Sequence, residues 1–299
     1  MELRVLQYFL AVAREQNISA AAESLHLSQP TLSTQLRQME EELGKQLLIR
    51  GTKGSRRIEL TDEGVIVRKR AEEILSLVQK MEQEVTANDE LIEGDVYIGA
   101  GETDTIRQLA RAARALQQRC PGIRYHIASG NANFVLEQLD KGLVDFGIVY
   151  GDIDPKKYES FQLPQRDTMG VLMRRDHPLA AQAIIRPEML WDQRLIVPHQ
   201  RGDDRRLSEW LGREVTELQI TATYNLVFNA SLLVDEGLGI ALCYDKLINT
   251  AQSNLCFRPL SPKMELTAQL VWKRYQVFSR AAENFLQALR QELGQQNPA

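Results

Sequence analysis

Small polar side chains lie together in one segment of the chain, and a run of cations follows it. Hydroxyl, amide and guanidinium groups of this kind hydrogen-bond to base edges and phosphate oxygens of nucleic acids. The candidates are Ser28, Gln29, Thr31, Ser33, Thr34 and Arg37, and the apolar Pro30 lies among them. Residues 44–57 then contain five cations and no anion, namely Lys45, Arg50, Lys53, Arg56 and Arg57. Such a basic segment favours phosphate binding, although a solvated loop can have the same composition.

Three short helices are predicted to position these side chains. Apolar residues recur at helical spacing in residues 3–14, and a second short helix is expected over residues 20–25. Ser28 can cap a third helix, in which Pro30 falls in the first turn, where a missing N–H has no cost. In residues 31–43 the apolar positions leave the polar candidates on other faces; these positions are Leu32, Leu36, Met39 and Leu43.

A basic hairpin is predicted after the third helix. Residues 47–50 and 56–60 are typical of two short strands around a turn of glycine, serine and lysine. Three helices and a hairpin in this order predict a winged helix-turn-helix over residues 1–60, with one helix in the major groove and the hairpin cations on flanking phosphates. A helical bundle whose third helix is merely solvated is the alternative.

A long helix is predicted next, over residues 61–90. Thr61 can cap it, and Asp62 and Glu63 suit the positive end of the helix dipole. A 3.5-residue apolar repeat then runs along the helix and is typical of a coiled-coil seam. We expect this linker helix to form a dimer, which would present two recognition helices to a pseudo-palindromic site; packing within the chain is the alternative. The seam residues are Val67, Ala71, Ile74, Val78, Met81 and Val85.

From about residue 91 the pattern changes to alternating strands and helices, which favours a mostly parallel sheet covered by helices. The pattern divides into two sets, with strands predicted to begin near residues 95, 123 and 144 and again near residues 169, 194, 218 and 239. The fold class is therefore α/β with an all-α-type N-terminal domain. Two α/β lobes of this size are expected to bind a ligand in the crevice beyond the strand ends.

Composition limits the other classes of function. The 299 residues carry 36 basic and 40 acidic side chains, a net charge of −4, but residues 1–57 alone are at +2 and the remainder is at −6. Three widely spaced cysteines suit a reducing cytoplasm. The N-terminus lacks the basic and apolar regions of a signal peptide, and no stretch is apolar enough to predict a membrane span. We therefore expect a cytoplasmic protein with no membrane partner.

The N-terminal motifs resemble those of the LysR-type transcriptional regulators. The resemblance is carried by Leu6-x-x-Phe9-x-x-Val12-Ala13, Ser19-x-Ala21-Ala22-x-x-Leu25, Leu27-Ser28-Gln29-Pro30-Thr31-Leu32-Ser33, Leu36, Glu40, Leu43-Gly44, Leu47-Leu48-x-Arg50 and Leu60-Thr61-x-x-Gly64. Weaker similarity continues through Asp145-Phe146-Gly147-Ile148, His177-Pro178-Leu179 and Gly237-Leu238-Gly239-Ile240-Ala241-Leu242. The resemblance thus spans nearly the whole chain.

This resemblance implies a winged helix-turn-helix, a dimerising linker helix and a two-lobed effector domain over residues 91–299, similar to periplasmic solute-binding proteins. The chain would cross between lobes near residues 161–164 and 262–266, so that lobe I comprises about 91–162 and 265–299 and lobe II about 163–264. The implied partners are double-stranded promoter DNA, a small-molecule effector and further copies of the chain, as a homodimer or homotetramer. RNA polymerase is left open as another partner, and no cofactor is implied.

Carried over by position, Gln29, Pro30 and Ser33 match residues that typically meet base edges, and Ser28 can cap the helix or bind a phosphate. Thr34 departs from the family pattern, in which arginine is common. That departure leaves Arg37 and the wing to supply positive charge.

The family often holds an anionic effector through a hydroxyl or amide residue after the first strand of the effector domain. Here Glu102 and Asp104 would oppose a carboxylate if they faced the cleft, and we expect them to interact instead with the dipole of the following helix. The effector candidates all follow predicted strand ends: Gly101, Thr103, Thr105, Ser129, Gly130, Asn131, Tyr150, Pro198, His199 and Gln200.

Three alternatives are weighed against a regulator. Nothing in the spacing pairs Cys243 with His199 as nucleophile and base, and the four histidines lack metal-ligand spacing, so neither an enzyme nor a metal site is expected. A solute-binding protein would need a signal sequence and would not need residues 1–90. A redox-sensing regulator of the same architecture, using Cys120, Cys243 or Cys256, stays open as a minor alternative.

Overall fold

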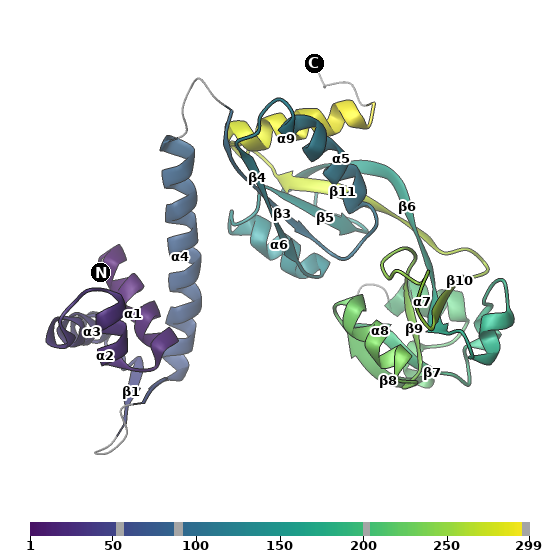
Figure 1. Ribbon diagram of the computed structural model, residues 1–299, viewed down its shortest axis with the longest axis horizontal. Coiled ribbons are helices and arrows are strands. Elements are labelled where there is room, and N and C mark those ends of the chain that lie inside the picture. The colour runs from purple at the N-terminus through teal and green to yellow at the C-terminus, as the bar shows by residue number, and fades with distance from the viewer. Residues whose placement is uncertain (52–56, 87–91, 200–203, 295–299) are drawn as a thin grey trace. The chain divides into compact units, whose positions relative to one another are not determined.

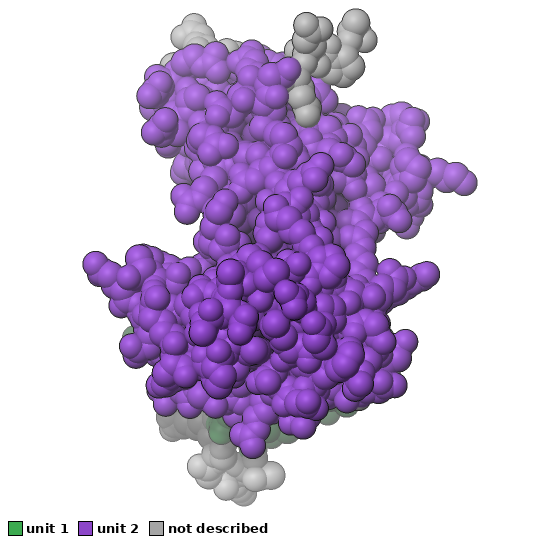
Figure 2. Space-filling view, turned by 90° about the vertical axis from the view of Figure 1, so that its right-hand side faces the viewer, with its two compact units in different colours: residues 1–86 green, residues 87–299 purple. Residues whose placement is uncertain are grey.

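The computed structural model describes residues 1–51, 57–86, 92–199 and 204–294. The chain divides into two compact units, residues 1–86 and residues 87–299, coloured separately in Figure 2. Each unit has its own hydrophobic core. Within the described ranges, no helix is both long and apolar enough to cross a membrane.

The first unit contains the three predicted helices, the hairpin and the long helix (Figure 1). Asn17 accepts hydrogen bonds from two backbone N–H groups at the start of the second helix. Ser28 accepts one from the N–H of Thr31 at 3.3 Å, so the predicted cap of the third helix is confirmed. Gly44 ends the third helix in the left-handed conformation. The elements are α1 (Leu3–Glu15), α2 (Ile18–Ser24), α3 (Gln29–Leu43), β1 (Leu48–Arg50), β2 (Ile58–Leu60) and α4 (Asp62–Thr86).

The start of α4 lies directly against the hairpin. Thr61 caps α4 through the N–H of Gly64 at 3.0 Å, as predicted. A Cβ added to Gly64 would lie 2.2 Å from the carbonyl oxygen of Leu47, so only glycine permits this approach. The close contact fixes the direction in which α4 leaves the hairpin.

The predicted seam on α4 is divided between two roles. Ala71 is buried in the core of its own unit, and Val67 packs against that core. The alternative of packing within the chain is therefore correct for these two residues, because the first turns of α4 cover α1. Further along, Ile74, Met81 and Val85 are 38%, 56% and 79% exposed.

The first lobe of the second unit has helices on both faces of a sheet. Strands β3, β4 and β5 are parallel, and β11 runs antiparallel beside β5. Phe146 and Ile148 of β5 face α5 and α9, whereas Val149 faces α6. The elements are β3 (Gly94–Ala100), α5 (Ile106–Gln117), β4 (Ile123–Ser129), α6 (Ala132–Asp140), β5 (Phe146–Tyr150), β11 (Glu265–Lys273) and α9 (Arg280–Glu292).

Strand β6 (Tyr158–Arg174) passes through both lobes without a break. Residues 158–168 pair with β11, and residues 169–172 pair with β9 of the second lobe. The first crossing therefore falls near Thr168 and not at residues 161–164, where we expected it. The second, just before Glu265, agrees with the expected range of 262–266.

The second lobe repeats the layered arrangement. Ile240 and Leu242 face a cluster that includes α7, and Ala241 and Cys243 face α8 on the other side. The order β6-β9-β7-β8 is flanked by β10, which pairs with β6. The elements are β7 (Arg194–Pro198), α7 (Asp204–Leu211), β8 (Gln219–Tyr224), α8 (Val227–Asp235), β9 (Ile240–Tyr244) and β10 (Leu255–Pro259), with short 3-10 helices at Pro178–Ala181, Pro187–Met189 and Val215–Glu217.

Candidate functional sites

The start of α3 presents an exposed polar surface. Leu32, Leu36 and Met39 bury the opposite face of this helix in the core. Ser33 is half-buried, and the other candidates on α3 and at its cap are exposed: Ser28, Gln29, Pro30, Thr31, Thr34 and Arg37. The Thr34 hydroxyl donates to the carbonyl oxygen of Pro30 at 2.9 Å, which ties this side chain to its own helix.

Glu40 joins α3 to the hairpin. One of its carboxylate oxygens accepts from the backbone N–H groups of Leu47 and Leu48, at 2.9 and 3.0 Å. The other accepts from Arg50 at 2.8 Å. The Glu40 side chain is 11% exposed. Arg50, predicted to bind phosphate, therefore forms an ion pair inside the domain and helps to orient β1. Glu40 lies within the segment that resembles the LysR-type regulators, but this role could not be read from the sequence, because its partner Arg50 is ten residues away.

The rest of the predicted wing is described in part. Arg57 is exposed, with its guanidinium 3.6 Å from the carboxylate of Glu59. Lys53 and Arg56 lie outside the described residues. The cations described at this hairpin are therefore Arg57 and, on the other strand, Arg50, which is paired with Glu40.

The second unit contains a cavity of about 380 Å³ between its two lobes. The carboxyl ends of β3, β5, β7 and β9 meet there, as expected for α/β lobes. Predicted residues that line it are Gly101, Gly130, Asn131, Tyr150 and Pro198. Lining residues that were not predicted include Glu102, Asn133, Asp152, Met169, Arg206, Tyr224, Asn225, Val227, Cys243, Tyr244 and Leu247.

Among the described residues, the effector candidates Thr103, Thr105, Ser129 and His199 are not part of the cavity lining. Ser129 and His199 are exposed elsewhere, and the backbone N–H of His199 donates to the carbonyl oxygen of Tyr224 at 2.7 Å. Gln200 lies outside the described residues. Asn131, which does line the cavity, also caps α6 by accepting from the N–H of Phe134 at 2.9 Å.

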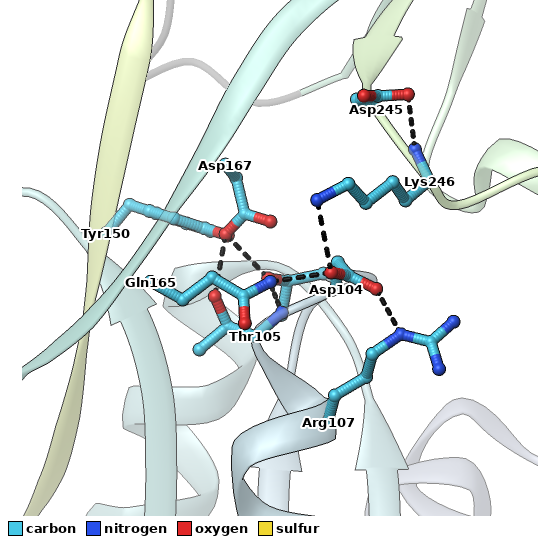
Figure 3. A network of polar contacts seen from close by, with 9 residues as sticks. Asp104, Thr105, Arg107, Tyr150, Gln165, Asp167, Asp245 and Lys246 are labelled. Atoms are coloured by element: carbon cyan, nitrogen blue, oxygen red, sulfur yellow. Dashed lines mark hydrogen bonds and ion pairs between the residues drawn. The ribbon is translucent and has the colours of Figure 1, made fainter. Parts of the chain in front are cut away.

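Thr103 and Thr105 are buried against Asp167 on β6. Both hydroxyls donate to the same oxygen of Asp167 at 2.8 Å, and the Tyr150 hydroxyl donates to it at 2.6 Å (Figure 3). Burial, and then the charge of Asp167, raises the pKa of Tyr150, so the phenol stays protonated and can donate. The structure thus places both threonines at the crossing between the lobes and outside the lining of the cavity.

Asp104 lies beside this network and is contacted from both lobes. It accepts from Gln165 at 2.6 Å and from Arg107 at 2.5 Å, and the ammonium of Lys246 in the second lobe is 3.9 Å away (Figure 3). The rings of Tyr150 and Tyr244 also stack across the lobes, with centroids 5.5 Å apart. These contacts connect the two walls of the cavity.

We expected Glu102 to interact with the dipole of the following helix, and this expectation was wrong. Glu102 lines the cavity, and its carboxylate accepts from the backbone N–H of Val227 at the start of α8 in the other lobe. The sequence held no signal for this pairing, since the two residues are far apart in the chain.

The three cysteines are free and buried. Burial raises the pKa of the Cys243 thiol to about 12, so very little of it is thiolate at neutral pH. This environment disfavours Cys243 as an oxidant sensor. Among the described residues, no group of three or more histidine, cysteine, aspartate or glutamate side chains has the arrangement of a metal site.

Comparison with known families agrees with both units. Residues 3–65 match the model described as "Bacterial regulatory helix-turn-helix protein, lysR family", and residues 89–294 match "LysR substrate binding domain". An exposed polar helix on a winged domain, followed by a two-lobed domain with a cavity, defines a transcriptional regulator with a DNA-binding and an effector-binding part. The chain belongs to the LysR family of such regulators.

Of the individual relatives, BudR, CbnR and BenM match over nearly the full length and OxyR over part of it. The chain is 26% identical to the regulator BudR of Raoultella terrigena, covering 96% of this chain and 99% of BudR. It is 32% identical to OxyR of Escherichia coli K12, over 60% of this chain and 58% of OxyR. Among solved structures, CbnR has a TM-score of 0.78 at 20% identity, covering 98% of this chain and 99% of CbnR. Full-length BenM has a TM-score of 0.53 at 26% identity, covering 100% and 99%.

Proposed function

We propose that the start of α3 reads base edges in the major groove of promoter DNA, while Arg37 and the hairpin cations bind flanking phosphates. The exposed polar surface of α3, opposite the buried Leu32 and Leu36, is the observation that carries this proposal. Small and polar side chains at a helix start can approach bases closely, and cations at the hairpin add affinity without sequence preference. The regulator would then act in the cytoplasm, with RNA polymerase as a further partner at the promoter.

Two substitutions separate base recognition from phosphate binding. Gln29→Ala should change which bases are preferred at one position of the site, at about 1–3 kcal/mol of discrimination. Arg57→Ala should weaken binding to all sequences alike and lower the slope of log affinity against log salt by about one. Fluorescence anisotropy with a set of single-base variants of the bound promoter fragment, repeated at several salt concentrations, measures both effects.

Arg68→Ala serves as the control, because Arg68 pairs with Glu72 on the surface of α4 and belongs to neither α3 nor the hairpin. It should leave both the preference and the salt slope as in the wild type. A Gln29→Ala protein with unchanged base preference, or an Arg57→Ala protein with an unchanged slope, would contradict the assignment.

For the second unit, we propose that a small-molecule effector binds in the cavity and modulates the regulator. The supporting observation is that both lobes supply its lining, so occupancy can change how the lobes are held together. Polar groups from four segments converge in it: Asn131, Asn133, Tyr150, Arg206 and Asn225. A largely preformed cavity with a few placed polar groups is the usual form of such a site.

A metabolite screen by thermal unfolding of the full chain tests this proposal. A ligand at one hundred times its Kd stabilises the folded unit by about 2.7 kcal/mol, which raises the Tm by roughly 5–10 °C. Asn225→Leu should abolish or reduce that shift, because Asn225 lines the cavity. Asn229→Leu, an exposed residue on α8 outside the lining, should retain it. A screen without a stabilising compound, or equal loss in both variants, would count against effector binding here.

A further inference from the structure

The cavity already contains a carboxylate placed at a helix start. Glu102 follows β3 in the first lobe, and its carboxylate accepts from the backbone N–H of Val227, the first residue of α8 in the second lobe. Leu226, at the N-cap position of α8, has no side chain that can accept a hydrogen bond, and no side chain of α8 caps the helix itself. The cap of α8 is therefore supplied across the cavity by Glu102.

The first N–H groups of a helix have no partner within the helix, and the helix dipole makes this end favourable for anions. An anionic ligand entering a cleft of this kind would normally use such a position. Here Glu102 satisfies the N–H of Val227 and also repels a second negative charge. Asp152 adds another carboxylate to the lining, whereas Arg206 is the cation among the described lining residues.

We propose that Glu102 is an internal substitute for an anionic ligand and determines the specificity of the cavity. It fills the position at α8 that a ligand carboxylate would take, so the effector presents a neutral or cationic hydrogen-bond donor, such as an amide or an ammonium group, to this end of the cavity. The proposal rests on effector binding in the cavity, and it adds the chemical class that the site selects.

Glu102 also connects the lobes, so its removal has a structural effect that can be measured without any effector. Glu102→Ala leaves the N–H of Val227 without its acceptor and should lower the Tm of the full chain by about 2–4 °C, as for loss of a helix cap. Sodium acetate, the simplest carboxylate, should then restore most of this loss relative to sodium chloride at equal ionic strength. The wild type should show no such difference between the two salts, because Glu102 already occupies the position.

Glu102→Gln separates the hydrogen bond from the charge. Its amide oxygen can still accept from Val227, so its Tm should lie closer to that of the wild type and respond less to acetate than the alanine variant does. Benzoate, a carboxylate on a ring that fits a cavity of this size, should stabilise Glu102→Ala and leave the wild type unchanged. Glu137→Ala, which removes an exposed glutamate paired with Lys141 on α6, is the control for a general effect of losing one negative charge.

The proposal is overturned if acetate and benzoate stabilise the wild type as much as Glu102→Ala, or if they stabilise neither. It is also overturned if Glu137→Ala gains the same acetate response. Failure of the metabolite screen would instead concern effector binding as a whole, since acetate rescue of Glu102→Ala depends only on the position at α8.

Discussion

Replacing Glu40 by alanine should destabilise the hairpin of the DNA-binding domain by about 2–5 kcal/mol. The substitution leaves the N–H groups of Leu47 and Leu48 and the guanidinium of Arg50 without their shared acceptor, and each unsatisfied buried group costs about 1–3 kcal/mol. Leu47 and Leu48 are 1% and 0% exposed, so water cannot readily replace the carboxylate. Hydrogen–deuterium exchange of peptides covering residues 46–50 in the full chain measures the effect directly.

Two variants control this experiment. Glu41→Ala removes the adjacent, exposed glutamate and should change stability by no more than about 0.5 kcal/mol. Glu40→Gln keeps an oxygen for the two N–H groups but removes the charge facing Arg50. The stability of its hairpin should therefore lie between those of Glu40→Ala and Glu41→Ala. Affinity for DNA should follow the same order, because the hairpin must be held in place to reach phosphates. Equal exchange in Glu40→Ala and Glu41→Ala would refute the role of Glu40.

The second large effect is expected on α4, where we propose that the exposed part of the seam binds a second copy of the chain. Ile74→Glu combined with Val78→Glu should give monomers in sedimentation velocity, since charges are costly in an apolar interface. Affinity for a two-half-site operator should fall by at least about a hundredfold, because each recognition helix then binds alone. Affinity for an isolated half-site should stay the same.

Ser76→Glu combined with Gln79→Glu is the matched control. It adds the same two charges to the same turns of α4, at exposed positions outside the seam. This variant should sediment and bind DNA as the wild type does. If the Ile74→Glu and Val78→Glu protein keeps its oligomeric state, the dimer does not form through this part of α4. Sedimentation of the wild type also distinguishes a dimer from a tetramer.

The first unit could be predicted from the sequence because its signals are local. Ser28, Pro30 and Gly44 mark the limits of α3, and its predicted apolar stripe is buried except for Leu43, which is exposed at the end of the helix. The assignment of Val67 and Ala71 was less certain, because a seam that continues into a domain core has the same spacing as one that binds a partner. Only the packing of α1 against α4 decides between the two.

The first half of strand β6 could not be predicted from the sequence. Pro164 interrupts the pattern, and a proline has no N–H for a central strand. In the structure the register with β11 shifts between Thr267 and Gln269, opposite this part of β6. A bulge there accommodates the proline, and such an accommodation depends on the partner strand.

The cavity was predicted in part for a similar reason. Residues at the carboxyl ends of parallel strands, such as Gly101 and Tyr150, can be found because strand ends share one edge of a sheet. Thr103 and Thr105 were misplaced because their hydrogen-bond acceptor, Asp167, is more than sixty residues away. Glu102 was misplaced likewise, since its donor belongs to the other lobe.

The continuity of β6 has a mechanical consequence for signalling. Two antiparallel strands, β6 and β11, carry the backbone between the lobes, and their ladder of hydrogen bonds extends to the crossing at Thr168 and Glu265. A paired ribbon twists more easily than it stretches, since the backbone of a strand is already close to its full length. We therefore expect the two lobes to rotate about the ribbon axis more readily than they move apart along it, so an effector in the cavity would change the twist of the ribbon.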